Sequence, residues 1–580
     1  MSALASDPEG EPLAISTLRG QFADNAQWRA DPARPAVVIG TVDMIGSRLL
    51  FGGYGCGFKS RPLHAGFLGQ HTLMVHDEAH LEPAFQDLLL DIEREQRNGR
   101  SPDLLPLHVM ELTATSRQQD SPFQLTPEER NPPAVSPNPP TEPIHDVWRR
   151  LKASKRIALH QVEDEKTLPD KIATLALEHK GSEDAVLVFV RKVEDVDKIV
   201  KKLPSGSTEQ LTGTLRGLER DALVGTPVFQ RFLPASNREP DAAAAPGAVF
   251  LVCTSAGEVG IDISADHMVC DLTPFDSMAQ RFGRVNRFGD RNDTRIDIVH
   301  PAAFGKKDKI DEFDLRRAKT LELLRSLKGD GSPTAIAALD PMLRTAAFTP
   351  LPRILPATDI LFDAWSMTTI RETLPGRPPL EPYLHGIDHS WEPPQTHVAW
   401  REEVQVITEA LLGQYKCEDL LDDYPLKSHE LLRDASYRVF QHLATLAERH
   451  PDKLAWLIDA RGQIDVVPLG KLADKNRKER IDHATVLLPP DVGGLDKGRL
   501  DGKAVCNANG PYDVSDEWYA DKARTVKRRL RNWDGSRPER MRLIRPPIDT
   551  CPEADELEAE SVPSRRFWYW YERPLNADGD

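Results

Sequence analysis

Two adjacent carboxylates, Asp77 and Glu78, open an Asp-Glu-Ala-His tetrapeptide that follows the apolar run LMVH. At the carboxyl end of a parallel strand, such a pair can divide its work at a nucleotide. Both are candidate ligands of Mg²⁺, which takes few carboxylates together with phosphate oxygens. We expect Glu78 also to orient the water that attacks a γ-phosphate, and His80 to sense that site. A short acidic string also occurs by chance in surface loops.

A second cluster of reactive side chains, Gln280, Arg284 and Arg287, lies far downstream in QRFGRVNRFG. We expect a helix over 277–289, in which the spacing i, i+4, i+7 places all three on one face. Arginines supplied across a cleft stabilise the charge that develops on a transferring phosphoryl group. We therefore expect Arg284 and Arg287 to contact the nucleotide and Gln280 to orient groups nearby. The alternative is a solvated, arginine-rich helix face.

Hydroxyl and glycine residues follow two further strand candidates. Thr113 and Thr115 end the run LHVMELTATS, and we expect them to couple nucleotide state to movement. Thr254 begins the loop TSAGEVGID, whose glycines permit tight turns. We expect Thr254 to donate to a DNA phosphate, and Gly260 and Asp262 to lie near the nucleotide. Taken alone, each stretch is also typical of an ordinary strand end or loop.

The elements that must position these residues form a repeated pattern. Short apolar runs alternate with helical patterns between residues 36 and 300, which predicts parallel sheets covered by helices. A Pro-rich stretch interrupts the pattern and indicates a linker between two α/β lobes. The expected strands are 36–40, 71–80 and 107–116 before the linker, and 155–162, 184–190, 248–255, 267–274 and 294–300 after it.

The same pattern divides the chain into five expected parts. They are a first lobe at 1–125, a linker at 126–150, a second lobe at 151–302, a helical connector at 303–345 and an accessory region at 346–580. Within the accessory region, we expect a hairpin over 454–469 and a strand with a loop over 483–495.

Bulk composition excludes several classes of protein. The net charge of −16 argues against a protein that coats nucleic acid non-specifically, although a locally basic groove can still hold a strand. No apolar run approaches the roughly 18 residues of a membrane helix, and the polar start differs from a secretory signal. Six scattered cysteines without a CxxC pair favour a reducing cytoplasm and argue against a zinc site.

In their order and spacing, these motifs resemble the signature of superfamily 2 nucleic-acid helicases with a DEAH box. Four stretches are similar to the helicase part of the CRISPR-associated helicase–nuclease of type I systems, in particular the subtype once called I-U. They are GTVDMIGSRLL, VHDEAHLEPAF, LTGTLRGLERD and QRFGRVNRFGD. The resemblance covers residues 10–300 and implies two RecA-like lobes, the first incomplete at its N-terminal side, with an accessory α+β region.

The resemblance also implies an activity and partners. It implies a cytoplasmic translocase that moves 3′ to 5′ on single-stranded DNA with ATP and Mg²⁺. The Cascade surveillance complex would recruit it to R-loop DNA for antiviral defence. The residues that the resemblance places on the DNA backbone are Thr17, Arg19 and Thr41 in the first lobe, and Thr212, Gly213 and Thr254 in the second.

Two departures from that family leave alternatives open. The phosphate-binding pattern GxxxxGK[ST] is absent from the sequence, and we expect this element to lie upstream or to have been lost. No HD nuclease is recognisable either, so we expect the nuclease on another polypeptide or beyond the chain. The alternatives are a non-catalytic remnant that binds DNA or Cascade, and another superfamily 2 motor such as an RNA helicase.

Overall fold

The computed structural model describes residues 13–113, 143–387 and 393–515 with short gaps, and a few positions outside these ranges. The gaps are 19–26, 30, 32–33, 54–58, 100–104, 239–244, 259, 306–309, 371–373, 407–416, 418–420, 422–425, 460–461 and 508–511. The chain forms two compact units, Met1–Thr212 with Gly225–Trp391, and Gly213–Val224 with Glu392–Asp580. None of the described helices is long and apolar enough to cross a membrane.

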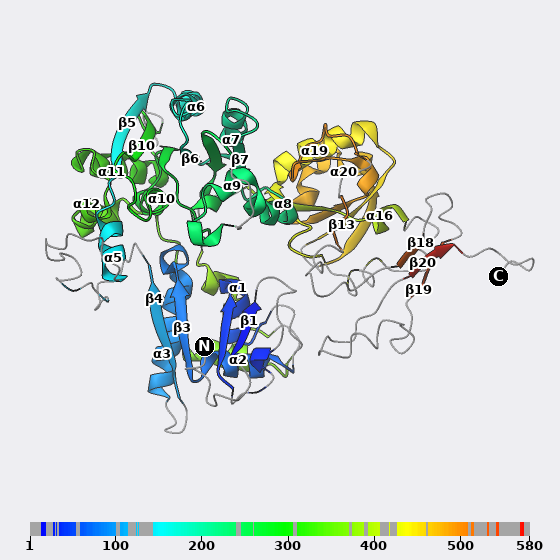
Figure 1. Ribbon diagram of the computed structural model, residues 1–580. Coiled ribbons are helices and arrows are strands. Elements are labelled where there is room, and N and C mark those ends of the chain that lie inside the picture. Colours follow the sequence, from blue (N-terminus) through cyan, green and yellow to red (C-terminus); the bar gives the residue numbers. More distant parts are fainter. Residues whose placement is uncertain are drawn as a thin grey trace, which may run out of the picture. The chain divides into compact units, whose positions relative to one another are not determined.

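The second lobe is built on a six-stranded parallel sheet, which confirms the expected α/β class (Figure 1). Three of its strands are buried at every position, as expected when helices cover both faces of a parallel sheet. In spatial order, the strands are β5 (Arg156–Val162), β10 (Arg295–Pro301), β9 (His267–Asp271), β6 (Ala185–Phe189), β8 (Val249–Cys253) and β7 (Thr208–Leu211). All the loops that follow these strands therefore open at one edge of the sheet.

Helices cover this sheet. The first two bury Ile172 and Ala176, and Val196 and Ile199, against the apolar side chains of the strands. The helix that begins at Glu312 has an N-cap in which the side chain of Asp311 accepts from the amide of Asp314. The helices of the lobe are α6 (Leu168–Leu177), α7 (Val193–Val200), α9 (Pro227–Gln230), α10 (Phe275–Phe282), α11 (Glu312–Ser326), α12 (Pro333–Ala337) and α13 (Pro341–Ala346).

Part of the expected linker is helical. Residues 127–142 lie outside the described residues, but helix α5 (Pro143–Leu151) begins inside the predicted 126–150 linker. Proline is tolerated in the first turn of a helix, because the amide it lacks has no partner there. Gly289, at φ +70°, packs against the backbone of Arg149, so that α5 lies directly on the second lobe.

The first lobe has two pairs of parallel strands, β1 (Ala14–Leu18) with β2 (Ala36–Gly40), and β3 (Thr72–Asp77) with β4 (Leu107–Leu112). Helices α1 (Val42–Leu49), α2 (Arg61–Gly69) and α3 (Pro83–Asn98) bury the apolar core of this lobe. The strands also carry exposed apolar side chains, namely Ile15, Val37, Ile39, Leu73, Val75, Met110 and Leu112. Within the described residues, these strands therefore bury one face more completely than the other.

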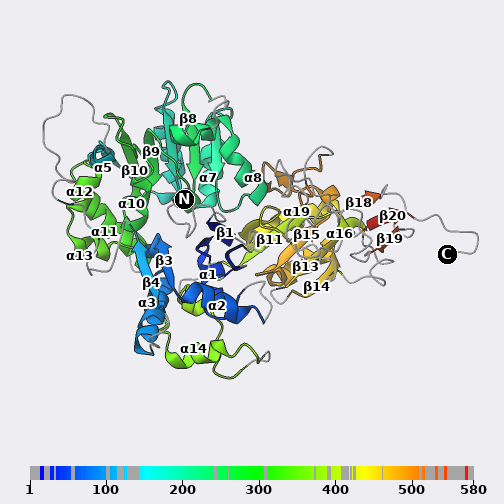
Figure 2. The ribbon, with the colours of Figure 1, turned by 60° about the horizontal axis from the view of Figure 1, so that its bottom comes forward.

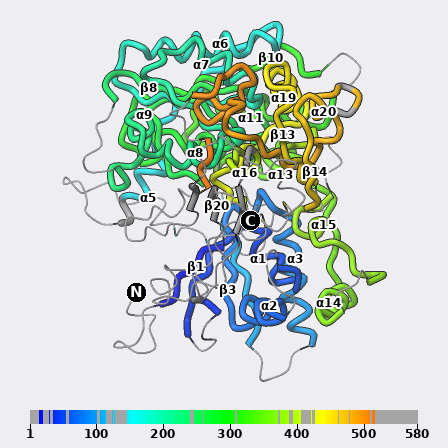
Figure 3. Tube along the Cα trace, turned by 90° about the vertical axis from the view of Figure 1, so that its right-hand side faces the viewer, coloured from blue at the N-terminus to red at the C-terminus, as the bar shows by residue number. Residues whose placement is uncertain are grey.

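A distant segment completes the core of the first lobe. Residues 353–387, which we call the return arm, begin and end at a bridge in which the amides and carbonyls of Arg353 and Ile387 pair at 2.8 and 2.9 Å. Its helices α14 (Asp359–Ser366) and α15 (Glu381–Leu384) lie beside the blue helices α1–α3 (Figure 3). The accessory region was expected to start at 346, whereas the second unit starts near 392.

The second unit has a five-stranded mixed sheet covered by helix α19 (Ser436–Arg449) (Figure 2). Val439, Leu443 and Leu446 lie on one face of this helix and join the core of the sheet. The predicted hairpin and the strand at 485–488 are both present. In order, the strands are β12 (Leu432–Ala435), β11 (Gln395–Trp400), β15 (Thr485–Leu488), β13 (Leu454–Ile458) and β14 (Ile464–Pro468).

Smaller elements complete this unit. They are α16 (Glu403–Val406), α20 (Leu469–Leu472), the pair β16 (Leu495–Asp496) and β17 (Arg499–Leu500), and a separate sheet of β18 (Leu530–Asn532), β20 (Tyr569–Glu572) and β19 (Met541–Ile544).

The second unit also contains a segment that leaves the second lobe, residues 213–224 with helix α8 (Gly217–Ala222). The fully buried guanidinium of Arg216 pairs with Glu219 and donates to the carbonyl of Tyr512 at 2.9 Å. The amides of Gly217 and Leu218 donate to the carbonyls of Leu431 and His429 at 3.1 and 2.9 Å. Residues 214–217 of this segment are therefore buried in the second unit, whereas residues 220–222 are exposed.

Gly217→Ala tests how tightly this segment is packed. An added Cβ would lie 2.4 Å from the carbonyl oxygen of Ser428 and 2.6 Å from Cα of His429, both backbone atoms. We expect a loss of about 1–3 kcal/mol in the free energy of unfolding of the second unit. Urea unfolding followed by fluorescence measures it, because Trp400 and Trp456 are buried there. The control is Gly225→Ala, whose Cβ meets nothing within 4 Å; equal midpoints for the two variants would contradict the packing.

Candidate functional site

The DEAH loop follows β3 directly. Its first carboxylate, Asp77, accepts a hydrogen bond from the amide of Glu78 at 3.0 Å. Glu78 adopts a left-handed backbone conformation with φ 51°, which is costly for a residue with a side chain and is common at functional sites. The short helix η3 (Ala79–Leu81) then turns the chain into α3. The loop thus presents Asp77 and Glu78 at the carboxyl end of β3.

Hydrogen bonds link this loop to β4 and to α10. The amide nitrogen of Gln280 lies 3.3 Å from Oε2 of Glu78 and 3.4 Å from Nε2 of His80. Since an amide N–H only donates, Nε2 of His80 accepts, and the ring proton is on Nδ1, 3.0 Å from Oγ1 of Thr113. Four residues predicted from three separate motifs therefore lie together. Thr115 lies outside the described residues.

The arginines of the second cluster are not on a helix, contrary to the expectation for 277–289. Helix α10 ends at Phe282, and the chain then turns with Asn286 at φ 43°. The turn is held by the backbone of Ala265, which donates to the carbonyl of Arg284 at 2.9 Å and accepts from Asn286 at 2.8 Å. The i, i+4, i+7 spacing is consistent with a helix, but these backbone bonds stabilise the turn instead.

Arg284 and Arg287 both contact the glycine-rich loop at 254–262. The guanidinium of Arg284 donates through Nε and Nη2 to the carbonyl of Glu258 at 2.9 and 2.7 Å. Burial and the charge of Arg287 lower the pKa of Arg284, and the carboxylate of Glu78 acts in the opposite direction. Arg287 lies 3.5 Å from Asp262. Arg284 is thus within the electrostatic field of Glu78.

Two buried residues that the sequence did not single out fix this geometry. The guanidinium of Arg281 pairs with Glu258 at 2.7 Å and with Asp271 at 2.9 Å. The carbonyl of Glu258 also accepts a hydrogen bond from Arg284. Glu258 therefore connects the glycine-rich loop, residues 254–262, to the turn at 283–287, which we call the arginine turn. Gly260, in the same loop, has φ +78°, a conformation that favours glycine. The sequence signal that could have pointed to Glu258 is its carboxylate, which stands among the small residues of this loop.

A third residue that the sequence did not single out, Lys155, is buried just before β5. Its ammonium donates to the carbonyl of Phe282 at 2.6 Å, at the end of α10. Burial, followed by the charge of Arg287, lowers the pKa of Lys155 to about 8. Lys155 therefore satisfies a terminal carbonyl of the helix that carries Gln280.

The residues predicted to contact DNA lie at strand ends. Thr212 and Thr254 follow the paired strands β7 and β8, and the amide of Thr254 donates to the carbonyl of Leu211 at 3.2 Å. Both threonines are buried in this structure. Gly213 begins the segment that belongs to the second unit.

The first-lobe candidates are arranged in a similar way. Thr41 follows β2, and its amide lies 3.4 Å from the carbonyl of Leu18 at the end of β1. Its side chain caps α1 by accepting from the amide of Met44 at 3.4 Å. Thr17 lies in β1, half-buried, and Arg19 lies outside the described residues.

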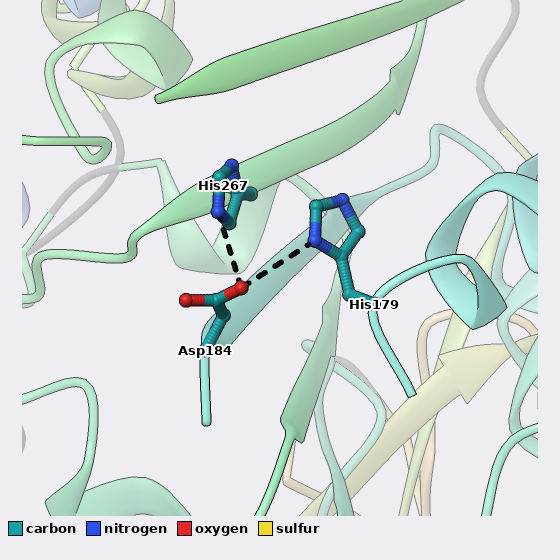
Figure 4. Close-up of side chains that lie close together, drawn as sticks. All are labelled: His179, Asp184 and His267. Atoms are coloured by element: carbon teal, nitrogen blue, oxygen red, sulfur yellow. Dashed lines mark ion pairs between the residues drawn. The ribbon is translucent and has the colours of Figure 1, made fainter. Parts of the chain in front are cut away.

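A histidine cluster elsewhere in the second lobe has the composition of a metal site (Figure 4). Nε2 of His267 and Nδ1 of His179 lie 3.3 and 3.7 Å from the same oxygen of Asp184. However, the amide of Arg295 donates to Nδ1 of His267 at 3.1 Å, which leaves the ring proton on Nε2, facing Asp184. Arg291 pairs with the other oxygen at 3.0 Å. The cluster lies at the amino ends of β6 and β9, and we assign it a structural role.

Arg281→Met tests whether the buried ion pairs hold the site. Without the guanidinium, the carboxylates of Glu258 and Asp271 lose their buried partner, which costs about 3–5 kcal/mol. We expect the thiols of Cys253 and Cys270, both fully buried in the sheet, to be labelled about 100–5000-fold faster in native buffer. Lys198→Met, which removes an exposed pair with Asp195, is the control and should change the rate little. Equal rates for the two variants would show that Glu258 and Asp271 do not depend on Arg281 as their buried partner.

Comparisons with known proteins relate this geometry to a family. Residues 182–290 match the family model of the CRISPR-associated nuclease/helicase Cas3, C-terminal. No curated protein matches the sequence. T. fusca Cas3 bound to ADP is 14% identical over 86% of this chain and 60% of that chain, with a TM-score of 0.45. The DUF1998 helicase MrfA bound to DNA is 13% identical over 83% and 57%, with a TM-score of 0.39.

The chain spans about half the length of several of these solved structures, for example 50% of T. fusca Cas3 bound to AMPPNP, which it matches at 13% identity over 66% of its own length with a TM-score of 0.39. The family match covers most of the six-stranded sheet of the second lobe. The matched segment contains the glycine-rich loop and the arginine turn. Residues 182–290 are therefore similar to the C-terminal part of Cas3-type CRISPR helicases.

Proposed function

We propose that the chain is an ATP-dependent translocase of single-stranded DNA that acts in CRISPR interference in the cytoplasm. The observation that carries the proposal is the position of Gln280, whose amide lies within 3.4 Å of both Glu78 and His80. A residue of the Cas3-type lobe thereby lies at the carboxylates of the DEAH loop. This arrangement suits hydrolysis of a nucleotide bound between the two loops.

Each residue of the site has a role in this proposal. Asp77 holds Mg²⁺, which prefers few carboxylates together with phosphate oxygens. Glu78 orients the attacking water and accepts its proton. Arg284 and Arg287 stabilise the negative charge on the transferring group. His80 relays the state of Glu78 to Thr113 through the hydrogen bond at its Nδ1.

DNA contacts complete the proposal. Thr212 and Thr254 in the second lobe and Thr17, Arg19 and Thr41 in the first bind backbone phosphates through hydroxyl, amide and guanidinium groups. Gly213 lets the backbone approach the strand closely. Because Thr212 and Thr254 are buried in this structure, DNA binding requires them to become accessible. Recruitment to R-loop DNA by Cascade, and cleavage by a separate HD nuclease, belong to the same proposal.

One observation favours a second candidate function, a non-catalytic protein that binds DNA or Cascade. The sequence contains no GxxxxGK[ST] pattern, the element whose amides and lysine bind the β- and γ-phosphates in related ATPases. In this candidate, the loop contacts hold the lobes together without turnover. Nucleotide binding separates the two candidates.

Arg284→Ala and Glu78→Gln test the catalytic proposal in the full chain. We expect each to lower DNA-stimulated ATP hydrolysis by about 1000-fold or more, because an arginine at the γ-phosphate contributes on that scale. Glu78→Gln should still bind Mg-ATP, since it keeps the shape of the side chain. Phosphate release with and without single-stranded DNA measures the rates, and titration with a fluorescent ATP analogue measures binding.

The control for charge is Arg325→Ala, which removes an exposed arginine from the last turn of α11 and should leave hydrolysis unchanged. Hydrolysis that persists in Arg284→Ala at the rate of the unmodified chain would exclude the arginine's proposed role. An unmodified chain that binds DNA but no Mg-ATP would favour the non-catalytic candidate.

A further inference from the structure

His385, at the end of helix α15 in the return arm, pairs with two carboxylates of the first lobe. Its Nε2 lies 2.9 Å from Oδ1 of Asp43, and its Nδ1 lies 3.0 Å from Oε2 of Glu82. Carboxylate oxygens only accept, so both ring nitrogens donate and the ring is an imidazolium cation. The hydrogen bond to Asp43 has the largest effect and the hydrogen bond to Glu82 the next largest, and together they raise the pKa of His385 to about 10.

The two carboxylates belong to different predicted motifs. Asp43 is in the first turn of α1, two residues after Thr41, the predicted DNA contact that caps this helix. Glu82 lies directly between the short helix η3, which ends at Leu81, and helix α3. A single cation therefore connects the start of the DNA-contacting helix to the end of the nucleotide loop.

Packing fixes the position of this cation. Leu384, the residue before it, is fully buried between α1 and α3. A Cβ added at Gly46 would lie 2.5 Å from Cδ2 of Leu384 and 3.0 Å from the ring of Phe85. The arm is further attached where the amide of Ala357 donates to Asp91 at 2.9 Å. Helix α15 packs between α1 and α3. The imidazolium therefore cannot move with one carboxylate without moving relative to the other.

We propose that His385 is a positioning residue that couples the nucleotide loop to the DNA-contacting end of α1. The proposal rests on the proposed function, because it assigns Thr41 and Glu78 the roles given above. Movement of the loop at 77–82 would shift Glu82, and the imidazolium would pass that shift to Asp43 and the first turn of α1. Coupling between sites can be carried by chains of hydrogen bonds and ion pairs, and these two hydrogen bonds form such a chain.

The charge state follows from the pKa values. The folded pKa of His385 is above its ordinary value, so its contribution to stability is complete below about 6.5 and is lost as the pH rises through about 10. The hydrogen bond from His385 lowers the pKa of Asp43, whose contribution is lost as the pH falls through that lowered value. The connection is therefore intact across the neutral range.

The test compares His385→Gln with His385→Lys. Glutamine keeps a donor but has no charge, whereas the lysine ammonium keeps the charge and can donate to both carboxylates. The readout is the ratio of single-stranded DNA affinities with and without a Mg-bound, non-hydrolysable ATP analogue. We expect the ratio of the unmodified chain, at least about fivefold, to fall toward one in His385→Gln and to be restored in His385→Lys. Above about pH 10, the unmodified chain should behave like the glutamine variant.

Hydrogen exchange provides the second readout. Peptides covering 41–49 and 79–92 should exchange faster in His385→Gln, while 185–189 in the second lobe should not change. The matched control is His160→Gln, which removes a histidine–carboxylate pair of 2.6 Å with Asp297 in the second lobe; it should leave the ratio unchanged. An unaltered ratio in His385→Gln, with coupling present in the unmodified chain, would overturn the positioning role. Absence of any coupling in the unmodified chain would refute the proposed function, and the inference with it.

Discussion

The contact of the Gln280 amide with Glu78 and His80 is the interaction on which the rest of the site depends. It joins the DEAH loop, which follows β3, to helix α10, which packs on the six-stranded sheet, although about two hundred residues separate them. Parallel strands make such a meeting possible, because every loop that follows a strand opens at the same edge of its sheet. The glycine-rich loop follows β8 and opens at that edge, whereas Arg284 and Arg287 follow α10 and are held by backbone bonds to Ala265, just before β9.

Buried charges keep this edge in place. Arg281 is surrounded by Glu258, Asp271 and the ring of Phe189, and Lys155 binds the end of α10. Burying a charge is expensive unless it is paired, so each of these residues is stable only in the geometry that supplies its partner. The same rule applies to Arg216 in the second unit, where the carboxylate of Glu219 is its partner. These pairs are therefore constraints on loop position more than sources of stability.

The sequence predicted the parts of the structure that depend on local pattern. The parallel sheet of the second lobe, five of its six strands and the hairpin of the second unit are confirmed, because apolar runs of this kind can bury both faces. Strand β9 ends three residues before the end of the predicted range, and β7 was not predicted. The helix over 277–289 was wrong beyond Phe282, since the turn is held by backbone bonds to Ala265, which the local spacing does not encode.

Distant contacts could not be predicted in the same way. The return arm completes the first lobe through Leu384 and Trp365, and residues 213–224 join the second unit; both depend on packing between segments far apart in the chain. Glu258 and Arg281 were missed because each looks ordinary until its partner is known. The roles of the carboxylates, arginines and threonines remain predictions, whereas the meeting of Glu78, His80, Thr113 and Gln280 is a property of the structure.

The central claim is that Glu78 and the arginine turn act on one triphosphate. An experimental structure of the full chain with Mg²⁺ and a non-hydrolysable ATP analogue tests it most directly. The account predicts the γ-phosphate between Glu78 and Arg284, with the guanidinium at about 2.7–2.9 Å from a phosphate oxygen. An analogue bound elsewhere, with Arg284 still on the carbonyl of Glu258, would contradict it.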